Sequence, residues 1–253
     1  MRWYHSIDLP EGVTPGEYDL RPIVARLPWP ESLAGARCLD VGSRDGFYAF
    51  EMERRGAAEV VSLDVDDPAE YHIPEPAPAG GDPYAEIEAG KRAFEHAHAA
   101  LGSQVRRVYR SVYDITPEEL GSFDFAVVGT LLLHLRDPVR ALRAVHGCLR
   151  GPLLVNDVVA AGPISLSHRP RAELLMENGP FWWVPNPAGL ERLVRAAGFE
   201  VVSRSRPYIV PWGAGGQHLS WRRTLRRPIS EIPRRLIHRR GALHVALLAE
   251  PVS

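Results

Sequence analysis

Cysteine is scarce in this chain of 253 residues, and lysine is almost absent. The two cysteines, Cys38 and Cys148, lie in a strand-like apolar run and in a helical pattern. Two cysteines in such places build neither a disulfide framework nor a zinc site. Lys91 is the one lysine, so arginine supplies nearly all of the positive charge. These counts exclude a disulfide-stapled scaffold, favour a reducing compartment and predict no metal centre.

Long apolar runs are missing as well. No stretch approaches the ~18 apolar residues that a membrane span needs, and the first residues lack the apolar core of a signal peptide. We therefore expect a soluble, cytoplasmic protein. The formal net charge of −1 does not indicate a general polyanion binder. The apolar content of 45% is ordinary for a globular core.

The charge that is present is unevenly distributed. Residues 59–88 hold nine acidic side chains and no Lys or Arg, whereas residues 204–240 hold ten arginines and one acid. Such asymmetry is typical either of separate patches for separate partners or of two solvated faces. Arginine pairs interleaved with Trp212 and Trp221 suit phosphates, acidic metabolites or an anionic surface. An acidic partner and a plain solvated or inter-subunit surface both stay open here.

Apolar runs alternate with helical patterns from residue 36 onward. Helices are expected at 48–55, 86–101, 138–149 and 188–197. Strands are expected at 36–41, 59–64, 105–112, 123–133, 152–159 and 243–248, and a further strand is expected to begin at 201. This alternation predicts an α/β fold with a doubly wound, mostly parallel seven-stranded sheet. No helical pattern separates the last two strands, so we expect the last strand to be antiparallel.

We expect one domain over residues 1–253. Residues 1–32, rich in Pro and Gly turns, are interpreted as an N-terminal arm. Residues 160–187 are expected to form a lid segment after the fifth strand. Residues 207–241 are expected to form a basic insertion before the last strand.

The most informative segment is Cys38–Tyr48, where an apolar strand runs into a glycine-bearing turn before a helical stretch. α/β folds bind nucleotide-shaped ligands at such turns. Of the dinucleotide fingerprint G-x-G-x-x-G only Gly42 is present, because Arg44 and Phe47 occupy the other two glycine positions. An NAD-dependent reductase is therefore disfavoured.

The same turn resembles the Asp/Glu-x-Gly-x-Gly-x-Gly signature of class I methyltransferases. Asp40, Gly42 and Gly46 match three of its four fixed positions, and Arg44 stands at the fourth. The resemblance implies S-adenosylmethionine as cofactor, with Asp40 receiving its ammonium group directly or through water. Arg44 has two interpretations: it pairs with the carboxylate of the cofactor, or it points outward.

Later strand ends complete the expected cofactor site. Asp64 lies 18 residues past Gly46 and is placed to accept both ribose hydroxyls. Asp114 is placed to accept from the adenine amino group, with its neighbours packing on the ring. Each acid alone is equally typical of a helix cap or a turn. The cofactor-binding prediction comprises Asp40, Gly42, Ser43, Arg44, Gly46, Phe47, Asp64, Val65, Tyr113, Asp114, Ile115, Gly129, Thr130 and Leu131.

Three later segments carry a family resemblance. Gly129–Pro138 (GTLLLHLRDP) resembles the strand-four signature of the tRNA wobble-uridine methyltransferase family, which forms carboxymethoxyuridine. Residues 178–186 are similar to the aromatic-Pro segment of that family, and Leu243–Pro251 to its final strand. The resemblance covers roughly residues 33–251 and implies the class I fold.

The departures from that family concern its donor, which carries an extra carboxylate. In the family a tyrosine and a C-terminal arginine help to hold this group, whereas this chain has Leu133, and Leu243 or His244, at those places. An apolar side chain cannot satisfy a buried carboxylate. We therefore predict ordinary S-adenosylmethionine as the donor.

Candidates for catalysis and substrate binding follow from the same placement. His134, after the fourth strand, is the best candidate base, because an imidazole pKa near 6.5 suits proton acceptance; orienting the next helix is the alternative. Substrate contacts are expected from the arm, the fifth strand and the lid. Anchoring of the arm, backbone support and packing of the lid are the alternatives for these residues: Tyr4, His5, Asp157, Trp182 and Trp183.

These observations predict methyl transfer to a hydroxyl or other nucleophile of a small metabolite. The missing carboxylate-binding positions and the short arm favour a small molecule over RNA. An RNA methyltransferase of the tRNA wobble-uridine type is the nearest alternative, because of the arginine-rich insertion. A catalytically silent nucleotide-binding module is the second, because Arg44 stands in the turn.

Overall fold

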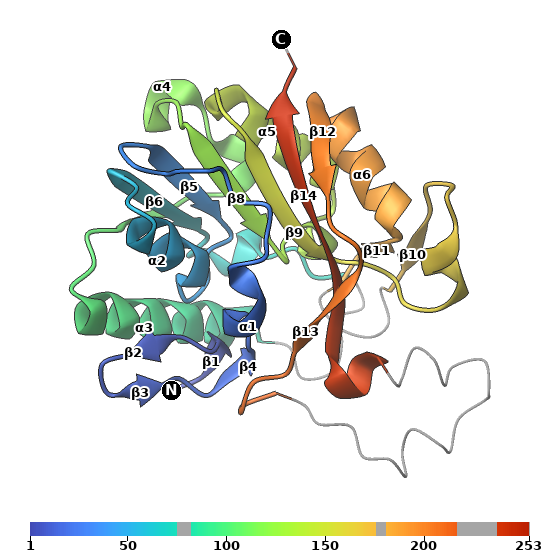
Figure 1. The fold of residues 1–253 in the computed structure, drawn as a ribbon. Coiled ribbons are helices and arrows are strands. Elements are labelled where there is room, and N and C mark those ends of the chain that lie inside the picture. Colours follow the sequence, from blue (N-terminus) through green and yellow to red (C-terminus); the bar gives the residue numbers. More distant parts are fainter. Residues whose placement is uncertain (75–81, 176–180, 217–236, 253) are drawn as a thin grey trace.

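A central sheet of eight strands organises the computed structural model, which describes residues 1–74, 82–175, 181–216 and 237–252 (Figure 1). Its strand order is β12-β14-β9-β8-β5-β6-β7, and β13 pairs with β14 beside β12. The strands are β5 (Arg37–Val41), β6 (Glu59–Asp64), β7 (Arg106–Tyr109), β8 (Phe125–Gly129), β9 (Leu153–Val158), β12 (Phe199–Arg204), β13 (Tyr208–Pro211) and β14 (Gly241–Pro251).

The direction of the strands confirms the expected topology. β5 to β9 pair in parallel, and β14 runs antiparallel to β9, β12 and β13. The described sheet differs from the expected seven strands by β13, which lies inside the stretch expected to be an insertion. Pro207 has no N–H to donate to a ladder, so the pairing of β12 with β14 stops before it and resumes at Tyr208.

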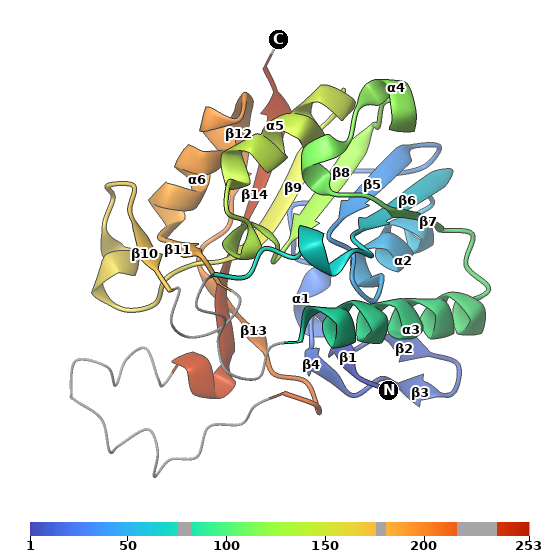
Figure 2. The same cartoon turned by 180° about the vertical axis from the view of Figure 1, so that it is seen from behind.

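Helices cover both faces of the sheet (Figures 1 and 2). One face carries α1 (Arg21–Val24), α2 (Phe47–Arg54) and α3 (Pro83–Leu101), and the other α4 (Pro117–Leu120), α5 (Pro138–Cys148) and α6 (Pro187–Ala196). Each of α3 to α6 begins with proline after a polar residue whose side chain accepts a backbone N–H. These are favourable first positions for a helix.

One hydrophobic core lies on each side of the sheet. Alternate side chains of a strand point to opposite faces, so Leu39 and Val41 of β5 pack in the core under α5 and α6, and Cys38 packs in the core under α2 and α3. All three side chains are almost inaccessible to solvent. The sheet is therefore held rigidly at the strand ends that carry the candidate site.

Several strands are shorter than the apolar pattern indicated, and short turns follow them. β7 ends at Tyr109, because Ser111 caps the turn η2 (Val112–Asp114). β8 ends at Gly129, because Thr130 turns the chain with a φ of 49° before η3 (Leu132–His134). The remaining short elements are η1 (Pro68–Glu70), η4 (Pro163–Leu166), and the paired strands β10 (Ala172–Leu174) and β11 (Trp183–Pro185).

The N-terminal arm forms small sheets of its own next to α3 (Figure 1). β1 (Trp3–His5) pairs in parallel with β4 (Gly16–Tyr18), and β2 (Asp8–Leu9) pairs with β3 (Gly12–Val13). The end of β13 and the turn after it close onto β4: Gly213 N–H donates to Glu17 O over 2.8 Å, and Gly215 N–H to Gly16 O over 2.9 Å. Within the described part of the chain, no helix is long and apolar enough to cross a membrane.

Candidate active site

A cavity of about 700 Å³ opens at the carboxyl ends of the parallel strands. Residues directly after β5, β6, β7, β8 and β9 line it, together with the arm and residues of the 160–187 segment. The strand order reverses between β5 and β8. Ligands of open α/β sheets bind in the crevice at such a point, and the volume is in the range of small-molecule and cofactor sites.

The turn after β5 forms the floor of this cavity. Gly42 has a φ of 70°, and a Cβ there would lie 2.9 Å from Leu131 Cδ1. Arg44 has a φ of 49°, the left-handed conformation that L residues adopt at a disadvantage of about 1–2 kcal/mol. This backbone explains why glycine is usual at that position. Ser43, Gly46 and Phe47, expected at the cofactor, belong to the same turn but do not line the cavity.

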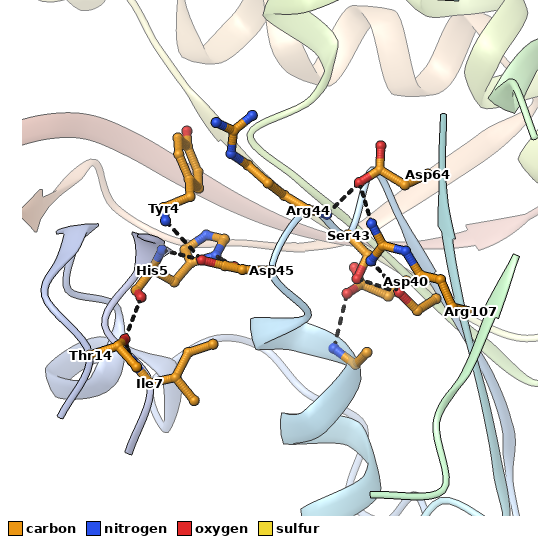
Figure 3. Close-up of polar contacts among 12 residues, drawn as sticks. Tyr4, His5, Ile7, Thr14, Asp40, Ser43, Arg44, Asp45, Asp64 and Arg107 are labelled. Atoms are coloured by element: carbon orange, nitrogen blue, oxygen red, sulfur yellow. Dashed lines mark hydrogen bonds and ion pairs between the residues drawn. The ribbon is translucent and has the colours of Figure 1, made fainter. Parts of the chain in front are cut away.

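Arg44 lines the cavity, and its side chain extends from the turn on the same side as Tyr4 (Figure 3). Its guanidinium forms an ion pair with Glu86, lies 3.4 Å from Tyr71 Oη, and stands 5.0 Å from the centre of the Tyr4 ring. Burial acts to raise the pKa of Glu86, but Arg44 and Arg2, which both pair with it, outweigh burial and the pKa is lowered. The outward orientation is therefore wrong, while a contact of Arg44 with a cofactor carboxylate stays a prediction.

Asp40 and Asp157 are placed differently from the expectation, since neither faces the cavity. Asp40 Oδ2 accepts the N–H of Ala49 over 2.9 Å and so holds the first turn of α2. Asp157 accepts the N–H groups of Leu132 and Val158 over 2.8 and 2.7 Å. Burial raises the pKa of Asp40 to about 6 and that of Asp157 to about 7. Both carboxyls support the backbone of the site. For Asp157 this is the alternative expected above, and for Asp40 a contact with the cofactor ammonium through water stays a prediction.

Asp64, at the end of β6, does line the cavity, as does Val65. Asp64 Oδ1 accepts from Val65 N over 2.8 Å, and Oδ2 accepts from Arg44 N over 2.6 Å and from Arg107 Nη2 over 3.0 Å. Arg107 Nη1 also donates to Ser62 Oγ, and Arg107 Nε is buried with no hydrogen-bond partner in the described chain. The contact of Arg107 with Asp64 could not be predicted from the sequence, because it depends on the register between β6 and β7.

Of the three residues expected around adenine, only Tyr113 lines the cavity. Its ring stacks on His72 with centroids 5.1 Å apart, and its hydroxyl accepts the N–H of Asp137 over 3.0 Å. Asp114 is more than half exposed and pairs with Arg140 over 3.6 Å, so it faces away from the cavity. Ile115 is buried in the core. The adenine contacts expected of Asp114 and Ile115 are thus corrected.

The end of β8 contributes the expected Gly129, Thr130 and Leu131 to the wall. Thr130 Oγ1 lies 3.2 Å from Nε2 of His244, whose Nδ1 lies 3.1 Å from Ala242 O. Because a carbonyl can only accept, Nδ1 carries the proton and the Thr130 hydroxyl donates to Nε2. Burial lowers the pKa of His244 to about 4.

The arm contributes Tyr4 and His5 to the cavity, both tied to Asp45 (Figure 3). Asp45 is fully buried; its Oδ2 accepts the N–H groups of Tyr4 and His5 over 2.9 and 2.7 Å, and its Oδ1 lies 2.6 Å from His5 Nδ1. Burial acts to raise the pKa of Asp45, but the neighbouring His5 outweighs it and the pKa is lowered. The sequence around Asp45 carries no local signal of this role, because its partner His5 lies 40 residues earlier.

The segment before α6 contributes Phe181 rather than the two tryptophans. Trp182 and Trp183 do not line the cavity, and Trp182 Nε1 instead donates to His72 O over 2.9 Å. Phe181 lines it and packs against His134, with ring centroids 5.2 Å apart. His134 also lines the cavity, and its role as base stays a prediction. The substrate contact expected of Trp182 is corrected to support of the wall through His72, and Trp183, whose Nε1 is buried without a hydrogen-bond partner in the described chain, does not face the cavity either.

The charges around the cavity are mixed. Acidic side chains (Glu17, Asp64, Glu70, Asp82 and Glu86) are at least as numerous in the lining as arginines (Arg2, Arg44, Arg107 and Arg110). Three arginine pairs of the expected basic insertion, at 222–223, 226–227 and 234–235, lie outside the described residues. Among the residues that are described, no cluster of three His, Cys, Asp or Glu side chains is placed to hold a metal ion.

The sheet order, its single antiparallel strand and a cavity at the turn after β5 define the class I methyltransferase fold. The family description "methyltransferase domain" matches residues 15–204. The chain belongs to this family, and the expected class of protein is confirmed.

Relatives within this class differ in what their names say they modify. A tRNA U34 carboxymethyltransferase of Pseudomonas aeruginosa is 29% identical over 66% of this chain and 46% of its own length. A ubiquinone biosynthesis O-methyltransferase of Xanthomonas euvesicatoria is 30% identical over 71% of this chain and 69% of its own. The chain thus spans about half the length of the tRNA-modifying relative.

Solved structures agree on the fold. An S-adenosylmethionine-dependent methyltransferase of Mesorhizobium loti superposes with a TM-score of 0.51 at 16% identity, covering 88% of this chain and 93% of that one. At this level of identity the likeness concerns the fold alone.

Proposed function

We propose that the protein transfers a methyl group from S-adenosylmethionine to a nucleophile on a small metabolite. The observation that carries the proposal is a single cavity that joins the turn after β5 to the aromatic residues of the arm. A volume of about 700 Å³ suits a cofactor and a small acceptor. The donor, when bound, supplies an electrophilic methyl group on a positively charged sulfur.

The residues at the strand ends fit such a donor. Gly42 leaves the floor of the cavity free of a side chain, so that a ligand can approach the backbone closely. Within the described residues, Asp64 Oδ1 accepts one hydrogen bond, from Val65 N, and retains capacity for a ribose hydroxyl. Tyr113 offers a ring at the next strand end for a flat base.

The substrate end of the cavity favours a flat, partly apolar molecule. Tyr4, Tyr18 and Trp212 form a continuous aromatic wall, with centroids 5.2 Å apart for the first pair and 4.8 Å for the second. Phe181 and Leu133 line the same cavity. The mixed charges of the lining would repel part of a polyphosphate backbone, which favours a metabolite over RNA.

An RNA substrate is the second candidate, and the similarity to tRNA-modifying enzymes motivates it. We would incubate the protein with methyl-tritiated S-adenosylmethionine and a bacterial lysate separated into an RNA fraction and a fraction below 1 kDa. We expect label in the small-molecule fraction only. Label in RNA, with binding that weakens steeply between two salt concentrations, would support RNA instead.

A silent binding module is tested by calorimetry. We expect both S-adenosylmethionine and S-adenosylhomocysteine to bind with one site per chain. If neither ligand binds, the methyltransferase proposal fails. If both bind but no fraction of the lysate accepts label, the silent module is favoured.

A further inference from the structure

We propose that His5, oriented by Asp45, is the general base of the active site, and that the acceptor is a flat molecule with an acidic hydroxyl of the phenol or enol type. This inference rests on the proposed function. It assigns the proton transfer to the N-terminal arm, whereas sequence analysis favoured His134.

The geometry of the pair is that of an oriented imidazole. Asp45 Oδ1 lies 2.6 Å from His5 Nδ1, the carboxyl is fully buried, and the His5 side chain is 8% exposed. A carboxylate at this distance holds the proton on Nδ1, so Nε2 carries the lone pair. Nε2 has no other hydrogen-bond partner in the described chain, and His5 lines the cavity. Enzymes often abstract protons with an imidazole of this kind. One ring nitrogen bonds a buried acid, and the other faces the cavity.

Anchoring of the arm does not require this imidazole. The backbone N–H groups of Tyr4 and His5 both donate to Asp45 Oδ2, so the arm would be held by Asp45 whatever side chain stood at position 5. The other carboxylate oxygen, Asp45 Oδ1, is bonded to Nδ1 of the His5 ring. The carboxylate therefore makes two separate kinds of contact, one structural and one that orients the ring.

The position of the ring places it beside the crevice between β5 and β8. The His5 ring lies 5.1 Å from Phe47 and 6.2 Å from Tyr48, both in the first turn of α2. Tyr48 in turn packs on the end of β8, because a Cβ on Gly129 would lie 2.3 Å from Tyr48 Cε2. The imidazole thus stands where the strand order reverses, the point at which a reacting group is expected.

The chemistry of the acceptor follows from the wall and the base. The Tyr4 ring is 4.7 Å from His5 and begins the aromatic wall that continues through Tyr18 to Trp212. A flat acceptor that stacks on this wall lies next to the His5 ring, where an edge hydroxyl can reach Nε2. An imidazole deprotonates phenols and enols far more readily than alkyl alcohols, because their pKa values are closer to its own.

The step balances within the named groups. The acceptor O–H proton moves to His5 Nε2 while the oxygen forms a bond to the donor methyl carbon. The carbon–sulfur bond breaks, and its electron pair stays on sulfur, which becomes a neutral thioether. The imidazolium is stabilised by Asp45 and returns its proton to water. No oxidant, metal or further reactant is required.

Reactivity toward diethyl pyrocarbonate tests the open Nε2 without any substrate. This reagent acylates an accessible, unprotonated imidazole nitrogen, and the modified histidine is identified by mass spectrometry. We expect His5 to react, and His244, which is buried and bonded at both ring nitrogens, to serve as the unreactive control. We expect Asp45→Asn to slow the reaction of His5 by about tenfold or more, since the amide can donate to Nδ1 and move the proton to Nε2. An unreactive His5, or a rate that is the same in Asp45→Asn, would overturn the assignment.

Methyl transfer tests the catalytic role. With tritiated donor and the small-molecule lysate fraction as acceptor, we expect His5→Ala to lose about 100-fold or more of the rate while binding S-adenosylhomocysteine within about twofold of the wild type. Added imidazole should restore part of the rate, which a purely structural histidine would not allow. Full activity of His5→Ala, or a loss confined to His134→Ala, would contradict the proposal. Absence of transfer by the wild type would refute the proposed function instead, and the acylation result would still decide whether the pair is a basic site.

Discussion

At the scale of single residues, Arg44 in the turn after β5 combines an unfavourable backbone conformation with several side-chain contacts. Arg44 adopts a φ of 49° and holds Glu86, Tyr71 and Tyr4 around the cavity. Because arginine is kept in a conformation that favours glycine, we infer that the contacts of its guanidinium contribute more free energy than the strained backbone costs. The two contributions can be separated by substitution.

Arg44→Gly and Arg44→Ala remove the same ion pair but differ in backbone freedom. Since only alanine retains the left-handed strain, we expect the glycine variant to have a free energy of unfolding about 1 kcal/mol higher than the alanine variant. Denaturant titration of both proteins measures this difference. Equal stabilities would show that the turn relaxes when the side chain is lost. If Arg44 also holds the donor carboxylate, both variants lose affinity for S-adenosylhomocysteine alike.

Asp64 is the residue on which cofactor affinity should depend most. We expect Asp64→Asn to weaken S-adenosylhomocysteine binding about tenfold or more, because a charged acceptor for the ribose is lost. The free energy of unfolding should also fall by about 1–3 kcal/mol, since Arg107 loses its partner. Calorimetry and denaturation measure the two effects. Asp66→Asn, at an exposed neighbour, is the matched control; equal affinities for both variants would show that the ribose site was misplaced.

At the scale of elements, Asn186 joins the helix α6 to the preceding segment. Its Oδ1 accepts the N–H groups of Gly189 and Arg171 over 2.8 and 3.0 Å, and the two N–H groups of its Nδ2 are shared among three carbonyls between residues 164 and 169. The side chain is fully buried. One amide thus fixes both the start of a helix and the path of the wall that borders the cavity.

We expect Asn186→Ala to lower the free energy of unfolding by about 3 kcal/mol, because it removes a cap and leaves buried backbone groups unpaired. Asp137→Ala, which removes an exposed cap at α5, should lower it by about 1 kcal/mol and is the control. Guanidinium titrations of the two variants give the comparison. Similar losses would indicate that water replaces the amide at Asn186.

The helices and strands could be predicted from the sequence more fully than the site residues could. Apolar runs and caps place the alternating strands and helices, because those signals are local. Asp40 was expected at the cofactor from the methyltransferase-like signature, and Asp157 at the substrate from its place at a strand end, but both carboxyls accept backbone N–H groups beneath the site. Arg107 and Asp45 were missed, since their partners depend on strand register and on the docking of the arm.

At the scale of the whole molecule, three buried groups make stability depend on pH in opposite directions. The pKa values of Asp40 and Asp157 are raised by burial, so their contribution is fully present below about pH 4 and is lost as pH rises toward 7. The pKa of His244 is lowered, so its neutral form contributes above about pH 6.5 and this contribution is lost as pH falls toward 4.

His244→Asn isolates the histidine contribution. We expect the difference in unfolding free energy between the wild type and this variant to shrink by about 3 kcal/mol as pH falls from 6.5 to 4. The pH-dependent contributions of Asp40 and Asp157 to the unfolding free energy cancel in this comparison, because both proteins contain these residues. Denaturation at several pH values provides the measurement. A difference that does not vary with pH would mean that His244 remains solvated.

The seating of the arm has a consequence for the order in which the protein is assembled. The arm is made early, yet its β4 strand is held by Gly213 and Gly215 near the other end of the chain, and His5 needs Asp45. Long-range closures of this kind come late in folding, and domains begin to fold during synthesis from the N-terminal side. The strands β5 to β9 can therefore pair during synthesis, but the arm can close over the cavity only after residue 215 has emerged. Nascent chains stalled before and after that point should differ in protease resistance at the arm.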